Sequence, residues 1–150
     1  MLMILIILIT NMKLLDIHGR PRSKMVSRYL IDWDKKSKSK IQFKVKQFLK
    51  PYWETHIVDE EFPVYGTRMK VDFINVTKKM AVEVHGPQHE SFNKFFHKNS
   101  RAAYLDSIKR DAKKAEWLEN NNFIFIEIYD KDIDNLSHKL IKDIYKVSLL

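Results

Sequence analysis

The sequence contains no cysteine among its 150 residues, and this absence excludes several kinds of chemistry at once. Disulfide scaffolds, thiolate zinc sites, iron–sulfur clusters and cysteine nucleophiles all need a thiol. A structural zinc site is therefore not expected. Glycine and proline are also scarce, with 3 and 4 residues, which excludes collagen-like and low-complexity chains. What remains is a chain of one ordinary domain's length that can bury a hydrophobic core.

No hydrophobic run in the sequence is long enough for a membrane-spanning helix. Residues 1–9 are apolar throughout, but a membrane-spanning helix needs about 20 apolar residues. The run also lacks the basic segment and the small-residue cleavage site of a secretory signal. One interpretation is that the biological start is Met12; another is a membrane tether formed by residues 1–15. We expect no membrane partner.

The positive charge of the chain is concentrated near its beginning. The formal net charge is +8, but residues 11–50 hold 12 basic and 3 acidic residues, whereas residues 51–150 hold 15 and 16. We therefore divide the chain into an apolar tail with a basic arm, residues 1–36, and an α/β domain, residues 37–150. A basic segment predicts a polyanionic partner, of which nucleic acid is the first choice. The alternative is that the segment is a surface helix whose charges face only solvent.

Hydrophobic periodicity predicts the element order α-β-β-β-α-β-α, an α/β fold with a mixed sheet of about four strands flanked by helices. The second and third strands form a hairpin, and Pro51 ends the first helix. Residues 16–36 have no clear pattern. The predicted helices are 37–50, 100–121 and 132–147, and the predicted strands are 55–62, 68–76, 80–84 and 123–129.

Acidic and imidazole side chains gather on the predicted hairpin. Asp72 lies on its first strand and Glu83 on its second, His85 shares a face with Glu83, and His89 follows the next turn. Two neighbouring carboxylates repel each other unless a cation lies between them, and Mg²⁺ prefers such hard oxygen ligands. Such a metal activates water and neutralises charge at a phosphate, with the histidines as acid, base or phosphate contact. The alternative is a solvent-facing aspartate and ordinary turn histidines.

The stretch from residue 71 to 89 resembles the core of the PD-(D/E)xK nuclease superfamily. It is most similar to the very-short-patch repair endonuclease branch and to the homing endonuclease branch with an E-D-x-H-D pattern. Asp72, Glu83, Gly86 and His89 match the motif, and His85 stands where the wider superfamily has lysine. The similarity covers about residues 38–130 and includes the helix with Lys114 and the strand FIFIEI that follows it.

This resemblance implies a restriction-endonuclease-like core and a Mg²⁺-dependent endodeoxyribonuclease, with Mn²⁺ as an alternative ion. It implies that Asp72 and Glu83 hold the metal, that Glu60 or Glu61 assists them, and that His85 or Lys114 takes the role of the missing lysine. The substrate it implies is double-stranded DNA, cut in a repair-like or homing-type reaction. A catalytically inactive DNA-binding module of the same fold is the rival interpretation.

The basic arm suits such a substrate. The sequence Gly19-Arg20-Pro21-Arg22 is similar to hooks that insert arginine into the minor groove, although a plain loop is its alternative. Lysines contact phosphates without reading sequence. We expect an enzyme acting in the cytoplasm, or a phage-encoded one acting in its host cell; a monomer and a homodimer both fit. The predicted DNA-binding residues are Arg20 and Arg22, for the minor groove, and Lys35, Lys36, Lys38 and Lys40, for phosphates.

Overall fold

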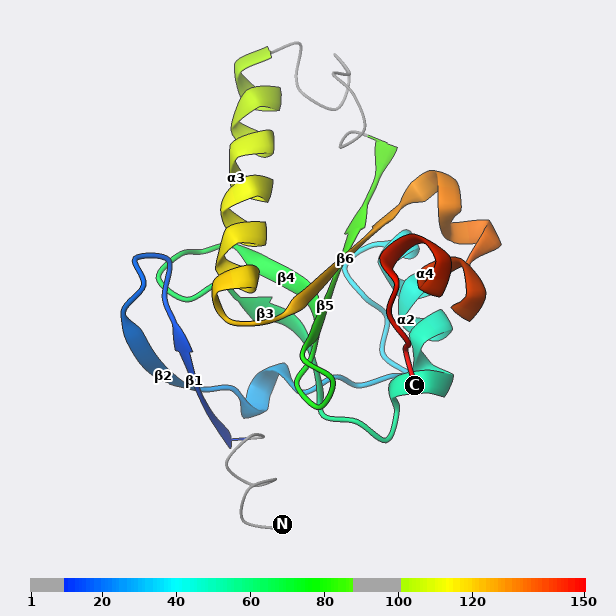
Figure 1. Ribbon diagram of the computed structural model, residues 1–150, viewed down its shortest axis with the longest axis horizontal. Helices are drawn as coiled ribbons and strands as arrows, with labels where there is room; N and C mark the ends of the chain where they lie inside the picture. Colours follow the sequence, from blue (N-terminus) through cyan, green and yellow to red (C-terminus); the bar gives the residue numbers. More distant parts are fainter. Residues whose placement is uncertain (1–9, 88–100) are drawn as a thin grey trace.

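The computed structural model describes residues 10–87 and 101–150 (Figure 1). Its centre is a four-stranded sheet in the order β3-β4-β5-β6. β4 is antiparallel to both β3 and β5, whereas β5 and β6 are parallel. The predicted mixed sheet and the predicted hairpin are both confirmed. The strands are β3 (Val58–Pro63), β4 (Lys70–Asn75), β5 (Met80–His85) and β6 (Ile124–Tyr129).

Helices and a second, smaller sheet cover the two faces of the central sheet. α3 (Arg101–Asn120) provides the crossover that the parallel pair requires, and it lies on one face with the β1–β2 hairpin (Figure 1). α2 (Lys40–Trp53) and α4 (His138–Tyr145) lie on the other face. Each face has its own hydrophobic cluster, one around Trp117 and one around Trp53. The sheet is thus buried on both sides, as expected for an α/β protein.

The first helix begins and ends three residues later than predicted. Ser39 caps its start, since its side chain accepts a hydrogen bond from the Gln42 amide. The helix continues through Pro51 to Trp53, so the prediction that Pro51 ends it was wrong. Proline removes one backbone donor, but Trp53 is fully buried and donates its indole N–H to the Leu149 carbonyl at 3.0 Å. Burial of this large side chain offsets the lost hydrogen bond.

The last predicted helix is divided in two. A 3-10 helix, η3 (Asp130–Asn135), precedes α4, and Leu136 and Ser137 between them have extended backbone. The Ser137 hydroxyl accepts a hydrogen bond from the Leu140 amide at 3.0 Å. This cap starts a new helix, which explains why one continuous apolar pattern gives two elements.

The turn and second strand of a β-hairpin, and a short 3-10 helix, occupy much of residues 16–36, where no clear pattern was visible. β1 (Asn11–Leu15) pairs with β2 (Pro21–Met25), and η1 (Ser27–Tyr29) follows. The Asp16 side chain closes the turn by accepting the backbone N–H groups of His18 and Arg20 at 2.8 and 3.0 Å. Gly19 has a φ of 78°, which glycine adopts without strain.

The hairpin packs on the main core. Met12, Leu14 and Val26 are buried in the cluster that contains Trp117. The Trp117 indole N–H donates to the Leu15 carbonyl at 2.7 Å. The segment predicted as a basic arm therefore contributes apolar side chains to the core shared with α3.

In the part of the chain that the structure describes, no helix combines the length and the apolar character needed to cross a membrane.

The packing of the hairpin makes a testable prediction. Leu14 is 8% exposed and Met25, on the partner strand, is 72% exposed. We expect Leu14→Ala to lower the free energy of unfolding by about 2–4 kcal/mol, because it leaves a cavity in the core. Met25→Ala should change it by less than about 0.5 kcal/mol. Urea denaturation measures both, and equal small effects would show that the hairpin does not belong to the core.

Candidate functional site

The candidate site lies where β4 and β5 separate. Their paired residues are Phe73–Asn75 with Met80–Val82; beyond them β4 stays with β3 while β5 continues beside β6. Asp72 and Glu83 occupy the first position of this fork. The Glu83 carboxylate accepts the Asp72 amide at 2.8 Å, and the Asp72 carboxylate accepts the Val84 amide at 2.8 Å. The two predicted metal ligands therefore bridge the separating strands with their side chains.

These two residues belong to a row of four carboxylates. Glu83 pairs in register with Glu127 on β6. On the other side, the pairs Phe62–Val71 and Glu60–Phe73 flank Glu61 and Asp72, which places these two at equivalent positions. We call Glu61, Asp72, Glu83 and Glu127 the acidic row. Like charges at directly opposite positions destabilise a sheet, so the row needs compensating positive charge.

Burial makes the central pair of the row difficult to ionise. Asp72 is 3% exposed and Glu83 is 6% exposed. Burial raises the pKa of Asp72, against the opposing effect of the nearby Lys38. Burial, together with the charge of Asp72, raises the pKa of Glu83 to about 7. Near neutral pH, Glu83 thus lies between its protonated and ionised forms.

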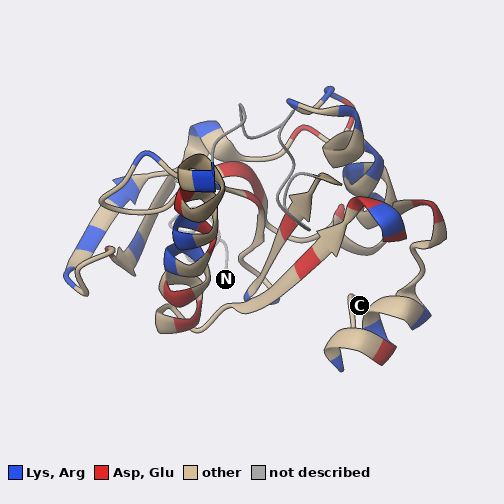
Figure 2. Cartoon of the chain, turned by 90° about the horizontal axis from the view of Figure 1, so that it is seen from above, with Lys and Arg blue, Asp and Glu red and all other residues tan. Residues whose placement is uncertain are grey.

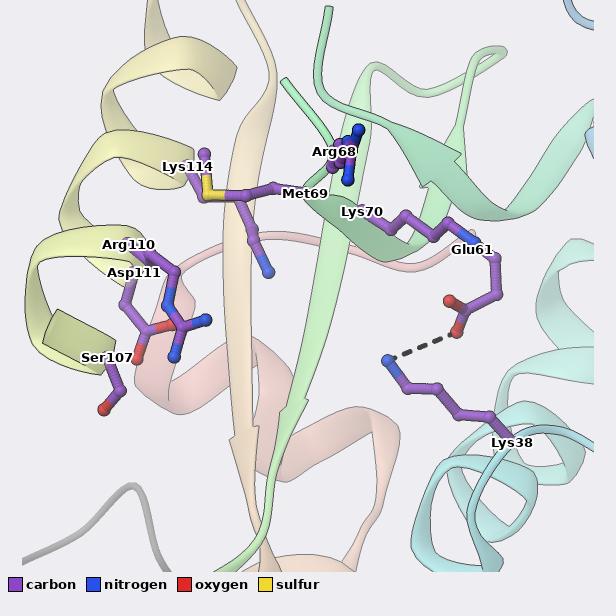
Figure 3. Close-up of a pocket in the computed structure, with 9 residues that line it drawn as sticks. All are labelled: Lys38, Glu61, Arg68, Met69, Lys70, Ser107, Arg110, Asp111 and Lys114. Carbon is purple, nitrogen blue, oxygen red and sulfur yellow. Dashed lines mark ion pairs between the residues drawn. The ribbon is translucent and has the colours of Figure 1, made fainter. Parts of the chain in front are cut away.

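Two lysines supply much of the missing positive charge. Lys114, from α3, donates to the second Glu83 oxygen at 2.9 Å. Lys38, from the loop before α2, lies 3.3 Å from the Asp72 carboxylate and 3.4 Å from the Glu61 carboxylate. Figure 3 shows the Lys38–Glu61 pair reaching toward the fork from the side opposite α3. Burial lowers the pKa of Lys38, but the charges of Asp72 and Glu61 outweigh it and leave the pKa raised.

His85 lies at the edge of the row. Its ring is 3% exposed, stacks on Tyr129 with centroids 5.0 Å apart, and donates from Nε2 to Glu127 at 3.1 Å. Burial lowers the pKa of His85, but the hydrogen bond and charge of Glu127 outweigh this effect and leave it raised. The structure thus places His85 beside Glu127. His89, the other predicted histidine, lies outside the described residues.

The structure separates the roles of Glu60 and Glu61, which the sequence left open. Glu60 binds the Lys46 ammonium at 2.7 Å and the Ser37 hydroxyl at 2.6 Å. Lys46 is only 1% exposed, so this pair is part of the protein interior between α2 and β3. Glu61 instead contacts Lys38 and lines two neighbouring cavities, whereas Glu60 lines only one of them. Its φ of 54° is left-handed, an uncommon conformation for glutamate. Geometry therefore favours Glu61 as the third acidic member of the site.

A cavity of about 330 Å³ opens beside the acidic row and is lined by Glu61 and by Lys38 and Lys114, the partners of Asp72 and Glu83 (Figure 3). Three of its basic residues were not singled out from the sequence: Arg68, Lys70 and Arg110. The available signals were their positions, since Lys70 lies two residues before Asp72 and Arg110 lies one helical turn before Lys114. Glu127, a single acid in an apolar strand, was missed because the register with β5 is a tertiary property. The lining residues are Lys38, Glu61, Arg68, Met69, Lys70, Ser107, Arg110, Asp111 and Lys114.

The residues predicted to bind DNA fall into three groups. Lys35, Lys36 and Lys38 line a second cavity of about 330 Å³ next to the first. Arg20 and Arg22 lie on the β1–β2 hairpin, where Arg22 pairs with Asp16 at 2.8 Å. Lys40 begins α2 and is absent from the lining of both cavities. In Figure 2 the acidic segments of the sheet lie between basic segments of α3 and of the α2 region.

The donor set of the row suits a hard cation. The described residues contain no group of three or more His, Cys, Asp or Glu side chains already arranged around a metal position. The Lys38 ammonium, however, lies within 3.4 Å of both Asp72 and Glu61, so these two carboxylates already flank one positive charge. Oxygen donors around an exchangeable cation are the ligand type that Mg²⁺ and Mn²⁺ take. Asp72, Glu83 and Glu61 are the residues that would hold such an ion.

The two glutamates of β3 can be distinguished experimentally. We expect Glu60→Gln to lower the free energy of unfolding by about 2–4 kcal/mol, because it leaves the Lys46 ammonium buried without its carboxylate. Glu61→Gln should cost less than about 1 kcal/mol, since its partner Lys38 is exposed. Chemical denaturation of both variants measures the difference. A larger loss for Glu61→Gln than for Glu60→Gln would reverse the assignment.

Comparison with known proteins shows a similarity to a viral protein. No protein-family model matches the chain, and no solved structure matches it. The chain is 36% identical over 66 residues to "Uncharacterized protein 033L" of Invertebrate iridescent virus 3. The match includes 44% of this chain and 34% of that protein, so the chain matches about a third of the relative's length. The chain is thus similar, over part of its length, to a viral protein.

Proposed function

We propose that this protein is a metal-dependent DNA endonuclease with a restriction-endonuclease-like core. One observation carries the proposal: the buried carboxylates of Asp72 and Glu83 meet at the fork of two strands, with a lysine on each. A fold seldom retains a buried pair of like charges for stability alone, because such pairs cost free energy unless they are compensated. Perturbed carboxyl groups beside a cavity are typical of functional sites.

The order of elements supports the same proposal. The chain supplies a helix, three antiparallel strands, a crossover helix and a fourth strand parallel to the third, with the acidic residues on the second and third strands. This is the arrangement that the resemblance to the PD-(D/E)xK nucleases implies. A repair-like and a homing-type reaction both fit this arrangement. The viral relative is in keeping with an enzyme that a virus or phage encodes for use in its host cell.

Lys114 is the best candidate for the positive group that the superfamily places on the third strand. Its ammonium lies 2.9 Å from Glu83 and also lines the cavity, so it can contact both a ligand carboxylate and a bound phosphate. His85 is less suited to this role, because its ring donates to Glu127 and stacks on Tyr129. We therefore assign Lys114 to stabilise negative charge on the reacting phosphate. His85 then serves as a positioning residue that holds Glu127.

The carboxylates bind a metal ion in this proposal. Asp72 and Glu83, assisted by Glu61, would hold a Mg²⁺ or Mn²⁺ ion, and a bound ion supplies a water molecule of lowered pKa and neutralises charge at the phosphate. Without the ion, Glu83, with its pKa raised to about 7, exchanges a proton with the solvent at neutral pH. Lys38 withdraws from Asp72 when another cation takes its place, and its ammonium becomes available to the substrate.

The test is nicking of supercoiled plasmid with Mg²⁺, Mn²⁺ or EDTA. Asp72→Asn and Glu83→Gln retain an oxygen that can accept the backbone N–H across the fork, so the fold should persist. We expect metal-dependent nicking by the wild type and a loss of at least about 100-fold in each variant, since a ligand and its charge are removed. Glu119→Gln, an exposed change on α3, is the matched control and should retain full activity.

Two other outcomes of the nicking assay would count against the endonuclease. Nicking that survives in both variants, or that proceeds in EDTA, would contradict the proposal. Binding of DNA with no nicking under Mg²⁺ or Mn²⁺ would favour the catalytically inactive DNA-binding module.

A further inference from the structure

Two neighbouring cavities meet at the acidic row. The first extends from the row to α3 and to the turn before β4, and the second extends from the row to η1 and the loop before α2. Lys38 and Glu61 line both of them. Each cavity has a volume of about 330 Å³. The open space beside the row therefore continues in two directions as a groove, with Glu61 and Lys38, the partner of Asp72, near its middle.

Basic side chains line each arm of this groove. In the first arm, Arg68, Lys70 and Arg110 are exposed and form no ion pair with any acidic group of the described residues. They differ in this respect from Lys38 and Lys114 near the row, whose ammonium groups are paired with carboxylates. Three exposed cations without acidic partners can each bind an anion at no cost in existing ion pairs.

The second arm carries three more exposed cations. Lys35 and Lys36 form no ion pair with the acidic groups that the structure describes. Arg28 packs over the Tyr29 ring at 5.0 Å and donates to the Tyr29 hydroxyl at 2.8 Å, which fixes its direction without neutralising its charge. Asp32 and Glu60 also line the second arm, but Glu60 is paired with Lys46, so basic side chains still predominate in both arms.

The hairpin is not part of this groove. Arg20 and Arg22 are absent from the lining of both cavities, and Arg22 is paired with Asp16. The net charge of residues 11–50 is therefore larger than the positive charge that this segment contributes to the groove. The groove instead combines residues from four separate segments: η1 and the loop before α2 on one side, and the turn before β4 and α3 on the other.

We propose that the groove is a track for one continuous DNA backbone, which passes over the acidic row and is held by phosphate contacts on both sides of the reacting bond. Arg68, Lys70 and Arg110 bind phosphates on one side, and Arg28, Lys35 and Lys36 bind phosphates on the other. The inference rests on the proposed nuclease function. It adds that the cleaved strand is bound by named side chains on both sides of the reacting bond, and that the hairpin arginines are dispensable.

The test is binding of a fluorescent DNA duplex, followed by anisotropy in EDTA at several salt concentrations. Three triple variants each remove three positive charges: Arg68→Gln/Lys70→Gln/Arg110→Gln, Arg28→Gln/Lys35→Gln/Lys36→Gln, and a control, Lys109→Gln/Lys113→Gln/Lys139→Gln. The control lysines are exposed, and two of them share α3 with Arg110. Melting temperatures establish that all three variants fold.

Each arm variant should bind at least about tenfold more weakly than the wild type. The slope of log K against log salt concentration should decrease in magnitude by about 2–3, because each lost phosphate contact removes about 0.9 from that slope. The control variant and Arg20→Gln/Arg22→Gln should change the slope by less than about 1. Equal losses in the arm and control variants would overturn the track in favour of general attraction by net charge.

The two proposals fail in different ways. If the wild type nicks DNA with Mg²⁺ while the arm variants match the control, the track is wrong and the nuclease stands. If the wild type neither binds nor nicks DNA, the nuclease proposal fails and the track fails with it.

Discussion

The structure depends on keeping four carboxylates in one row across a sheet whose middle strands separate. Asp72 and Glu83 are almost fully buried there, and each accepts a backbone N–H of the opposite strand. Each of these contacts favours the ionised carboxylate, whereas burial and mutual repulsion disfavour it. Lys38 and Lys114 provide the local balance, and His85 forms a hydrogen bond with Glu127. Each member of the row thus has a lysine or a histidine side chain beside it.

The rest of the fold serves to place those cations. α3 presents Lys114 to Glu83 because Trp117 and Leu118, on the same face of the helix, are buried in the core. The loop that carries Lys38 is held by an interior network in which Lys46 binds both Glu60 and the Lys35 carbonyl. The hairpin in turn supports α3, since Leu15 accepts the Trp117 indole. Packing on both faces of the sheet therefore determines the electrostatics of the fork.

Local pattern was enough to predict the sheet, the hairpin and the central pair of the site. Alternation identified the strands that carry Asp72 and Glu83, and helical spacing identified α3. Contacts that depend on tertiary register were not predictable: Glu127 beside Glu83, and Lys38 between Asp72 and Glu61. The β1–β2 hairpin was missed because its second strand is exposed and polar and lacks an alternating pattern. The choice between Glu60 and Glu61 required the position of Lys46, which no spacing in the sequence reveals.

The central claim is that the row is a site for an exchangeable divalent cation, and isothermal titration calorimetry with Mg²⁺ and Mn²⁺ tests it most directly. We predict binding to the wild type at millimolar concentrations or below. Binding at pH 7 should release protons, because the pKa of Glu83 is raised to about 7 and the ion needs its ionised form. Asp72→Asn and Glu83→Gln should weaken it at least about tenfold, whereas Glu119→Gln should not. Absence of binding to the wild type, or equal binding to all four proteins, would contradict the account.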